Sequence, residues 1–568
     1  MHAGGLRRIE RRLAVARGDL PADLVLRGGR VLSVFTREWL DTDVAVSDGH
    51  VVGLGVYDAE RVLDLHGAHL VPGLIDAHVH IESSKLTPDQ FARAVLPRGT
   101  TAIVADPHEI ANVLGSDGVH WVLDTLDMLP LDVFVMAPSC VPASRFESAR
   151  QELSAGAIAG LLRRRRVIGV AEMMNFPGVI AGDPAELAKL ETGLTDHVDG
   201  HAPTVTGRAL NAYVAAGIAS DHEATTLEEA REKRRLGMAI MLREASNARN
   251  LVDLLPLVRE YGTEGLMFCT DDREPDFIEA EGHMNQMVRV AVAHGVRPED
   301  ALVMASWNPA QFHGLRGLGA IAPGFQADLV VLDDLVRFEP RLVLKRGREP
   351  VFGSVPVPEW VCRTVRPARL EPGSFRVPAS DGARARAIRI IPGQLLTAEQ
   401  AVGARVVGGC LEADPQLDLA KVAVVERHHA TGRVGVGFVT GTGLREGAFA
   451  STVAHDAHNI VVVGMDDRSM AECVERLVEI GGGIVVVRAG RAVDDLPLPV
   501  AGLMSDRPLA EVARGLRRLE ARLRDLGVGL EAPFMALSFL ALSVIPRLKI
   551  TDRGLVDVDR FEVVSPVL

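Results

Sequence analysis

The sequence predicts an α/β protein built on a (β/α)₈ barrel of the TIM type, with a flanking composite β subdomain and an additional C-terminal α/β domain. Eight short apolar runs alternate with helical stretches between about residues 74 and 272. Short strands punctuated by glycine precede these runs, and strand-like segments return at 318–372. Strands that alternate with helices form parallel sheets from βαβ units, and eight such units close into a barrel.

The chain of 568 residues is divided accordingly into four segments. Residues 1–70 are expected to hold an amphipathic N-terminal helix and the first part of the β subdomain, and residues 71–320 the catalytic barrel. Residues 321–380 would complete the β subdomain and then supply a linker rich in Pro, Gly and Arg. Residues 381–568 are expected to form the C-terminal α/β domain, with strands at KVAVVER, RVGVGFV, NIVVVGM and GIVVVRAG.

Composition excludes several classes of protein. The net charge of −13 argues against a nucleic-acid partner, which would require a basic surface. No stretch of about 18 apolar residues occurs, so no membrane span is expected. The five cysteines include no CxxC pair, which suits a reducing cytoplasm better than a disulfide scaffold. We therefore expect a cytoplasmic protein with a small-molecule substrate, and a homo-oligomer at this size.

The first barrel strand carries the strongest chemical signal. It ends in the segment Asp76-Ala77-His78-Val79-His80, after an apolar run that begins behind Pro72-Gly73. Side chains at positions i and i+2 of a strand face the same side, so His78 and His80 point together at the C-terminal mouth of the barrel. Barrel enzymes keep their active sites at this mouth, and imidazole binds zinc, iron or manganese. Two histidines that only form structural hydrogen bonds would give the same sequence pattern. The residues at the other strand ends must therefore decide between a metal site and a structural role.

Four later strand ends also carry residues that bind metals. Glu172 ends VIGVAE, His201 follows a DG pair, His222 ends IASDH, and Asp271 ends LMFCTD. Any one of them alone would more often be structural. Their occurrence in order, at successive predicted strand ends, predicts a metal site.

This order of HxH, bridging residue, His, His and Asp resembles the amidohydrolase superfamily. Many of its binuclear members have a carboxylated lysine on the fourth strand, where this chain has Glu172, which disfavours a dihydroorotase- or hydantoinase-like enzyme. Longer segments are similar to the adenine deaminase family. They are PGLIDAHVHIESSKLTP (72–88), RGTTAIVADPHEIANVLG (98–115), the GHAP, SDHE and TDDR segments, and TVAHDAHNIVVVG (452–464). The resemblance covers the chain from about residue 20 to 568.

The resemblance implies a site for two divalent metal ions. One ion would be bound by His78 and His80 with Asp271, the second by His201 and His222, and Glu172 would bridge them. The family commonly uses Mn²⁺ or Fe²⁺, and the spacing does not exclude Zn²⁺. The implied reaction is hydrolytic deamination in purine salvage, in which a metal-activated hydroxide attacks C6 of adenine and yields hypoxanthine and ammonia.

Three residues are predicted to be catalytic. Asp271 would take a proton from the attacking water and deliver one to the leaving amine. His222 would act beside it as the second catalytic residue. Glu109, or its neighbour His108, would contact the purine or protonate a ring nitrogen. The alternative for this segment is a helix start, since proline and acidic residues favour the first turn.

Other residues are candidates for substrate binding. Arg243 either polarises the substrate or holds a carboxylate, or it forms a structural salt bridge. The C-terminal HDAH segment either completes the active site or holds a further metal, or it forms a capped turn. The full set of candidates comprises Glu82, Ser83, Asp106, His108, Arg243, His455, Asp456 and His458.

Two alternatives to adenine deamination are considered. A related amidohydrolase acting on another aminopurine or a cyclic amide would use the same metal site. A non-catalytic binder that kept the barrel would be indicated by the loss of a ligand, and all six predicted ligands are present. The zinc cytidine deaminase class is rejected, because its H-x-E and P-C-x-x-C signature is absent.

Overall fold

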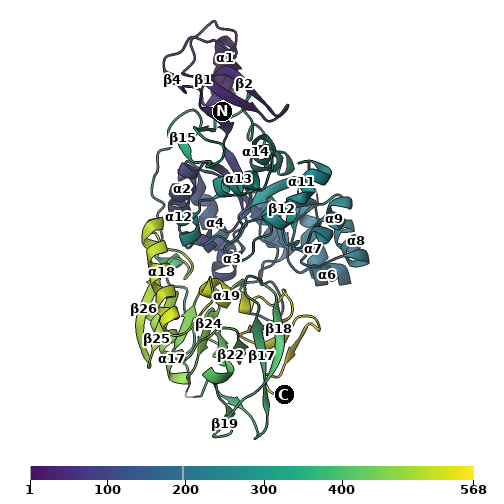
Figure 1. Ribbon diagram of the computed structural model, residues 1–568, viewed down its shortest axis with the longest axis vertical. Coiled ribbons are helices and arrows are strands. Elements are labelled where there is room, and N and C mark those ends of the chain that lie inside the picture. The colour runs from purple at the N-terminus through teal and green to yellow at the C-terminus, as the bar shows by residue number, and fades with distance from the viewer. Residues whose placement is uncertain (1, 195–196, 372) are drawn as a thin grey trace.

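The computed structural model describes residues 2–194, 197–371 and 373–568. Three parts follow one another along its long axis (Figure 1). The N-terminal β subdomain lies at one end, the barrel in the middle, and a C-terminal unit at the other end. The helix expected at the N-terminus is present as α1 (His2–Ala16).

The β subdomain is assembled from both flanks of the barrel. Its main sheet has the strand order β15-β14-β5-β1-β2-β3, with β4 paired to β1. The strands are β1 (Leu24–Ser33), β2 (Glu38–Ser47), β3 (His50–Leu54), β4 (Val62–Asp64), β5 (His69–Pro72), β14 (Leu329–Leu332) and β15 (Pro340–Leu344). The pairing of β14 with β5 joins a strand after the barrel to the strand that leads into it, as the sequence predicted.

Eight parallel strands form the barrel, which confirms the predicted fold class. They are β6 (Leu74–Val79), β7 (Thr100–Ala105), β8 (Asp132–Ala137), β9 (Val167–Met173), β10 (Val198–Gly200), β11 (Ser220–Asp221), β12 (Ala239–Arg243) and β13 (Leu266–Cys269). Hydrogen bonds join them in two arcs, β6 to β10 and β11 to β13. Asp76 closes one seam, because its carboxylate accepts hydrogen bonds from the Thr270 hydroxyl at 2.5 Å and the Thr270 amide at 3.1 Å.

Helices and short 3₁₀ turns surround the strands. The helices are α2 (Pro88–Val95), α3 (His108–Leu114), α4 (Ser116–Thr125), α5 (Ala155–Leu162), α6 (Phe176–Ala181), α7 (Pro184–Gly193), α8 (Gly207–Ala215), α9 (Leu227–Arg235), α10 (Leu251–Leu254), α11 (Pro256–Tyr261), α12 (Pro275–Ala280), α13 (Met284–Ala293), α14 (Pro298–Ala305) and α15 (Trp307–Phe312). The 3₁₀ turns are η1 (Glu82–Ser84), η2 (Leu96–Arg98) and η3 (Leu126–Met128).

The C-terminal unit is centred on a large sheet of order β18-β17-β22-β21-β24-β23-β25-β26. Its strands are β17 (Arg384–Ile390), β18 (Thr397–Gly403), β21 (Ala420–Val425), β22 (Val434–Thr440), β23 (Ala448–Ser451), β24 (Ile460–Gly464), β25 (Gly483–Arg488) and β26 (Arg491–Pro497). Two small sheets contain β16 (Val377–Pro378), β19 (Val406–Val407) and β20 (Cys410–Leu411), and β27 (Leu548–Thr551), β28 (Gly554–Asp557) and β29 (Glu562–Val564). The helical segments are α16 (Glu359–Cys362), η4 (Pro415–Leu417), α17 (Asp467–Glu479), α18 (Leu509–Asp525), α19 (Pro533–Ser538) and η5 (Phe539–Ala541).

The C-terminal unit docks on the mouth of the barrel. Helix α19 lies at the junction between the two parts (Figure 1). The loop after β8 is held there by buried polar bonds: the Ser148 hydroxyl donates to Asp552 at 2.7 Å, and the Asn459 amide donates to the Ser148 carbonyl at 2.9 Å. Since buried polar groups require partners, these bonds fix the orientation of the unit over the strand ends.

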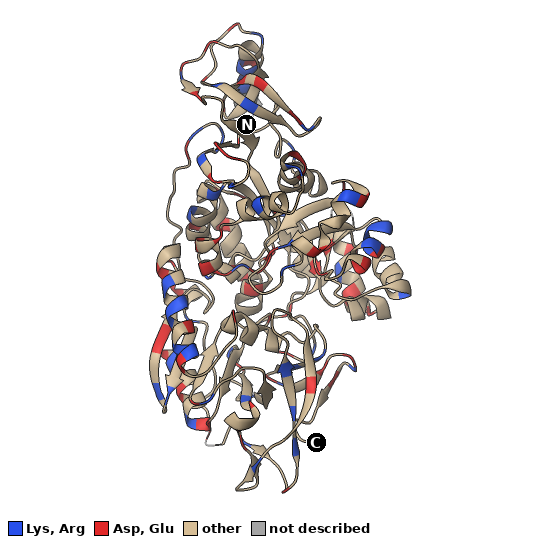
Figure 2. Cartoon of the chain, in the orientation of Figure 1, with Lys and Arg blue, Asp and Glu red and all other residues tan. Residues whose placement is uncertain are grey.

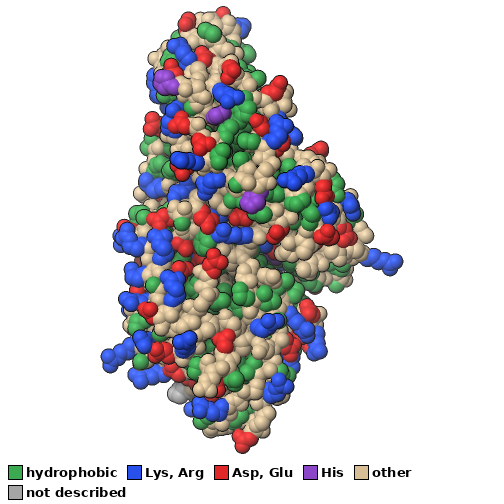
Figure 3. Space-filling view, viewed as in Figure 1, with side chains coloured by type: hydrophobic (Ala, Val, Ile, Leu, Met, Phe, Trp, Pro, Cys, Tyr) green, Lys and Arg blue, Asp and Glu red, His purple; other side chains and the backbone are tan. Residues whose placement is uncertain are grey.

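Charged side chains of both signs are interspersed along the chain, with no part of the fold reserved for one sign (Figure 2). On the face drawn in Figure 3, basic and acidic side chains likewise alternate with hydrophobic ones. Within the described ranges, no helix combines the length and the apolar character that crossing a membrane requires.

Candidate metal centre and active site

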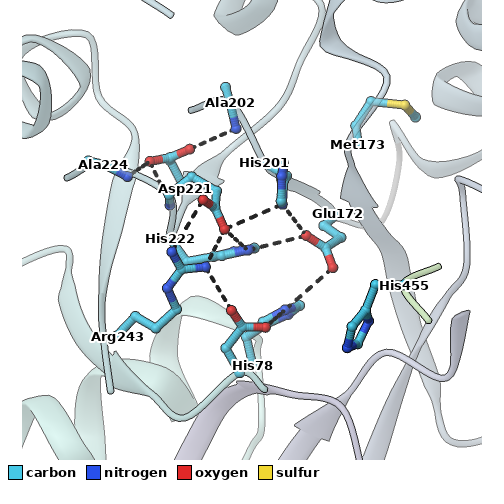
Figure 4. Close-up of polar contacts among 12 residues, drawn as sticks. His78, Glu172, Met173, His201, Ala202, Asp221, His222, Ala224, Arg243 and His455 are labelled. Carbon is cyan, nitrogen blue, oxygen red and sulfur yellow. Dashed lines mark hydrogen bonds and ion pairs between the residues drawn. The ribbon is translucent and has the colours of Figure 1, made fainter. Parts of the chain in front are cut away.

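Six buried side chains converge at the C-terminal ends of the barrel strands. They are His78, His80, Glu172, His201, His222 and Asp271, each at most 5% exposed. Figure 4 shows His78, His201 and His222 turned toward the Glu172 carboxylate, which lies to one side of them. The structure therefore brings together all six residues that the sequence predicted as ligands.

The two oxygens of Glu172 face different histidine pairs. Oε1 lies 3.3 Å from His80 Nε2 and 3.6 Å from His78 Nε2. Oε2 lies 2.6 Å from His201 Nδ1 and 3.2 Å from His222 Nε2. A carboxylate whose two oxygens face separate pairs of histidines has the arrangement needed to bridge two cations.

The HxH pair is oriented by the backbone. His78 Nε2 and His80 Nε2 lie 3.1 Å apart, so both nitrogens face one point. The other ring nitrogen of His80, Nδ1, lies 3.0 Å from the carbonyl oxygen of Asp106. A histidine that donates one ring N–H to a carbonyl presents its second nitrogen as a lone pair, as metal-binding histidines do.

Asp271 lies between the histidines and a buried arginine. Its Oδ1 is 3.1 Å from His80 Nε2, while its Oδ2 accepts a hydrogen bond from Arg243 Nη1 at 2.8 Å. Arg243 also binds both carboxylate oxygens of Glu223. Arg243 thus forms salt bridges with two carboxylates at the edge of the centre, and a salt bridge is one of the three roles the sequence left open for it.

The loops that carry His201 and His222 share one buried anchor. The Asp221 carboxylate accepts hydrogen bonds from the amides of Ala202 at 2.9 Å and Ala224 at 2.9 Å, and from Lys233 Nζ at 2.8 Å. Figure 4 shows this carboxylate between Ala202 and Ala224. Asp221 therefore fixes the ends of β10 and β11 relative to each other.

Electrostatics at the centre favour bound cations. Burial favours the neutral imidazole of His222, but the Glu172 carboxylate outweighs burial and raises the pKa of His222 to about 9. Burial would raise the pKa of Glu172, but the imidazoles of His201 and His222 hold it well below its usual range.

The donor set also fits divalent ions. One atom each from Glu172, His201 and His222 lie within 4.8 Å of one another, and so do atoms of His78, His222 and Asp271. His201 Nε2 is buried without a hydrogen-bond partner in the described structure. Mixed imidazole and carboxylate donors suit zinc, iron and manganese alike.

A second polar cluster lies behind the wall of the site. The Ser83 hydroxyl lies 2.7 Å from Glu109 Oε1 and 2.5 Å from Asp272 Oδ1, and His458 Nε2 lies 3.7 Å from Glu109 Oε2. Glu82 accepts a hydrogen bond from the amide of Ile110 at 3.2 Å, so it supports the start of α3.

Five residues that the sequence made candidates do not line the central cavity. Glu82, Ser83, Asp106, Glu109 and His458 are buried but absent from its surface. Asp106 instead pairs with His108, at 2.9 Å from Nδ1. The helix start proposed as the alternative for 106–109 is also present, since α3 begins at His108.

The C-terminal unit contributes polar groups to the cavity itself. Asp456 Oδ1 lies 3.6 Å from His108 Nε2, and the His455 ring stacks on Phe539 with centroids 4.7 Å apart. Both His455 and Asp456 line the cavity. His455 enters Figure 4 from the side opposite Arg243.

Several cavity residues escaped the sequence interpretation. Two are charged, Glu223 and Asp272, and each directly follows a predicted ligand, which was the available signal. The others are apolar, and no motif marks them: Met174, Leu395, Phe539, Leu542 and Ile545.

Comparison with known proteins gives matches in both halves of the chain. Residues 69–350 match the amidohydrolase family, and residues 394–562 match the adenine deaminase C-terminal domain. An adenine deaminase of Desulfatibacillum aliphaticivorans is 48% identical over 561 residues, with 97% of this chain and 98% of that protein covered. An adenine deaminase of Methanothrix thermoacetophila is 47% identical, with 98% of each chain covered. One of Brucella suis is 46% identical, with 96% and 95% covered.

Proposed function

Because the chain belongs to the adenine deaminase family of the amidohydrolase superfamily, we propose that it hydrolyses adenine to hypoxanthine and ammonia. The observation that carries the proposal is the Glu172 carboxylate, divided between two histidine pairs at the mouth of the barrel. Relatives of this identity, matched over nearly their whole length, support adenine as the substrate.

The proposed centre holds two divalent ions, Mn²⁺ or Fe²⁺. His78, His80 and Asp271 would hold the first, His201 and His222 the second, with Glu172 between them. When bound, such ions supply Lewis-acid polarisation and lower the pKa of a water molecule. The buried, ionised carboxylates of Glu172 and Asp271 favour this occupancy.

Asp271 is the proposed acid–base group. Its Oδ1 faces the centre and its Oδ2 is held by Arg243, which keeps the carboxylate ionised and aimed. Burial opposes this, but the hydrogen bonds from His78 and His80 and the charge of Arg243 hold the pKa of Asp271 well below its usual range. An ionised carboxylate accepts a proton from the attacking water as the oxygen bonds to C6 and the π electron pair of the C6–N1 double bond moves to N1. It then returns a proton to N6, the C6–N1 double bond re-forms as the C6–N6 bond breaks, and ammonia leaves.

His222 is proposed to support the same step from the other side of the centre. Its ring stacks against His78, with centroids 4.4 Å apart, and its Nε2 faces Glu172. Arg243 and Glu223 form the adjoining wall. The C-terminal unit forms the side of the cavity opposite the metal centre. There, His455 and Asp456 are proposed to contact the purine.

Glu109 is proposed to act through its neighbours, since its carboxyl lies behind the cavity wall. The Ser83 hydroxyl connects it to Asp272, which does line the cavity. Ser83 has one hydrogen for two carboxyl oxygens, so its bonding fixes the relative placement of Glu109 and Asp272. We assign Glu109 a positioning role for Asp272.

Ammonia release tests the proposed function. Protein purified with Mn²⁺ or Fe²⁺ is expected to release one ammonia per hypoxanthine from adenine, and none from adenosine. The same protein with metals confirmed bound, but inert toward adenine, would contradict the proposal. Activity on cyclic amides or on other aminopurines would then identify the related amidohydrolase reaction.

A further inference from the structure

Two adjacent spaces lie between the barrel mouth and the C-terminal unit. The inner one, beside the predicted ligands, leaves about 20 Å³ of free volume. The outer one leaves about 310 Å³ and is lined on the barrel side by Thr204, Thr225 and Asn250, among others. Glu223, Arg243, Leu395 and Ile545 line both spaces, and Leu395 and Ile545 are the apolar pair at the boundary between them.

The inner space is too small for a purine as it stands. A volume of this size holds about one water molecule. The barrel side of the space is formed mainly by buried charged groups, whereas the opposite side is mainly apolar, with Leu395, Phe539, Leu542 and Ile545 beside His455 and Asp456. A base that reaches the centre must therefore displace the apolar side.

One part of that side is the tip of a β-hairpin. Strands β17 and β18 pair antiparallel up to Ile390 and Thr397, and residues 391–396 form the connecting turn. Gly393 has φ of 72°, a conformation that glycine adopts without steric cost. Pro392, Gly393 and Gln394 are exposed, while Leu395 is half-buried and faces the two spaces. The tip is thus an exposed turn that presents one apolar side chain to the site.

A buried lysine holds the tip in this closed position. Lys549 Nζ donates hydrogen bonds to the Leu395 carbonyl at 2.8 Å and to the Phe539 carbonyl at 3.0 Å. It therefore ties the hairpin tip to η5, which supplies another part of the apolar side. Burial lowers the pKa of Lys549 to about 7, and no carboxylate offsets this shift.

We propose that the hairpin tip 391–396 is a lid that closes Leu395 against Ile545 over a free purine base and rejects purines substituted at N9. This inference rests on the proposed function, since it places C6 at the metal centre. An N9 substituent then projects away from the centre, toward the passage between Leu395 and Ile545. A flat base lets the lid close behind it, whereas a ribosyl group occupies the passage.

Selectivity between adenine and N9-substituted adenines tests the lid. Leu395→Ala and Ile545→Ala widen the passage without touching a charged group. Each is expected to raise kcat/KM for 9-methyladenine and adenosine, relative to adenine, by about tenfold to a hundredfold, the range that hydrophobic pocket contacts give. Ile545→Val, which keeps most of the packing, should give a smaller rise of the same sign. Leu396→Ala is the matched control, because Leu396 lines the outer space and not the inner one.

Lys549→Met provides a second, independent variant. It keeps the length of the side chain but removes both hydrogen bonds to the lid, so selectivity should relax while bound metal stays unchanged. An unchanged selectivity ratio in Leu395→Ala, Ile545→Ala and Lys549→Met, with adenine still deaminated, would overturn the lid. A wild-type protein inert toward adenine would instead overturn the proposed function, so the two failures are distinguishable.

Discussion

The two halves of the active-site wall are built on opposite principles. The barrel half consists mainly of buried imidazoles, carboxylates and one guanidinium, most of them at strand ends. The half supplied by the C-terminal unit is mainly apolar, with Leu395, Phe539, Leu542 and Ile545 beside His455 and Asp456. The barrel half is suited to bind cations and move protons, and the C-terminal half to select and enclose the substrate. Chemistry and selectivity should therefore respond to different mutations.

The largest effect is expected at Glu172. Glu172→Gln keeps the shape of the side chain but removes the charge that faces both histidine pairs. Loss of supporting residues around a metal site already costs about 10- to 100-fold, so loss of the bridging charge should cost more than about 100-fold in kcat. Bound metal should fall as well, as measured by elemental analysis. Full activity with two metals per chain would assign the bridge to another group.

Asp271→Asn should give the next largest loss. A positioned acid–base group contributes about 10²- to 10⁴-fold, so kcat should fall in that range while the protein stays folded by circular dichroism.

His455→Ala, on the opposite wall, should mainly raise KM for adenine. If both variants changed KM and kcat alike, the division of roles between the two halves would be wrong.

Arg243→Gln should chiefly lower stability. It leaves the carboxylates of Asp271 and Glu223 buried without their cation, and breaking a buried pair costs about 3–5 kcal/mol. Chemical denaturation of the metal-free protein would measure the change. Arg165→Gln is the control, since its pair with Asp127 is exposed and should contribute no more than about 1 kcal/mol. Equal losses in both variants would contradict the buried network.

A further effect on stability concerns pH and the C-terminal half. The pKa of Lys549 is about 7 in the folded chain, against an ordinary value of 10.5. Between these values the unfolded chain binds the additional proton, so folding stability should rise with pH from about 7 to 10, by at most about 1.4 kcal/mol per pH unit. Below pH 7 both states are protonated and this contribution stays flat. Urea denaturation of wild type and Lys549→Met should diverge across this window, and parallel curves would contradict the buried lysine.

The sequence predicted the barrel half in detail because ligand spacing follows strand geometry. His78 and His80 must share a face of β6, and parallel strand ends must meet at one mouth. The composite β subdomain and four strands of the large C-terminal sheet, β21, β22, β24 and β25, were also predicted from local patterns, whereas β17, β18, β23 and β26 were not.

The C-terminal half of the wall could not be predicted in this way. Leu395 and Ile545 reach the cavity only through the docking of distant segments, and no local pattern distinguishes them from core residues. Glu109 is a different case. The sequence places it near the HxH segment, but whether its carboxyl lines the cavity or lies behind the cavity wall depends on how α3 packs.

The most direct test of the central claim is a metal titration of the apoprotein, followed by ammonia release from adenine. Activity should rise with Mn²⁺ and saturate at two ions per chain, because Glu172 faces two separate groups of ligands. Full activity at one ion per chain, or two ions bound without ammonia release, would contradict the binuclear deaminase centre.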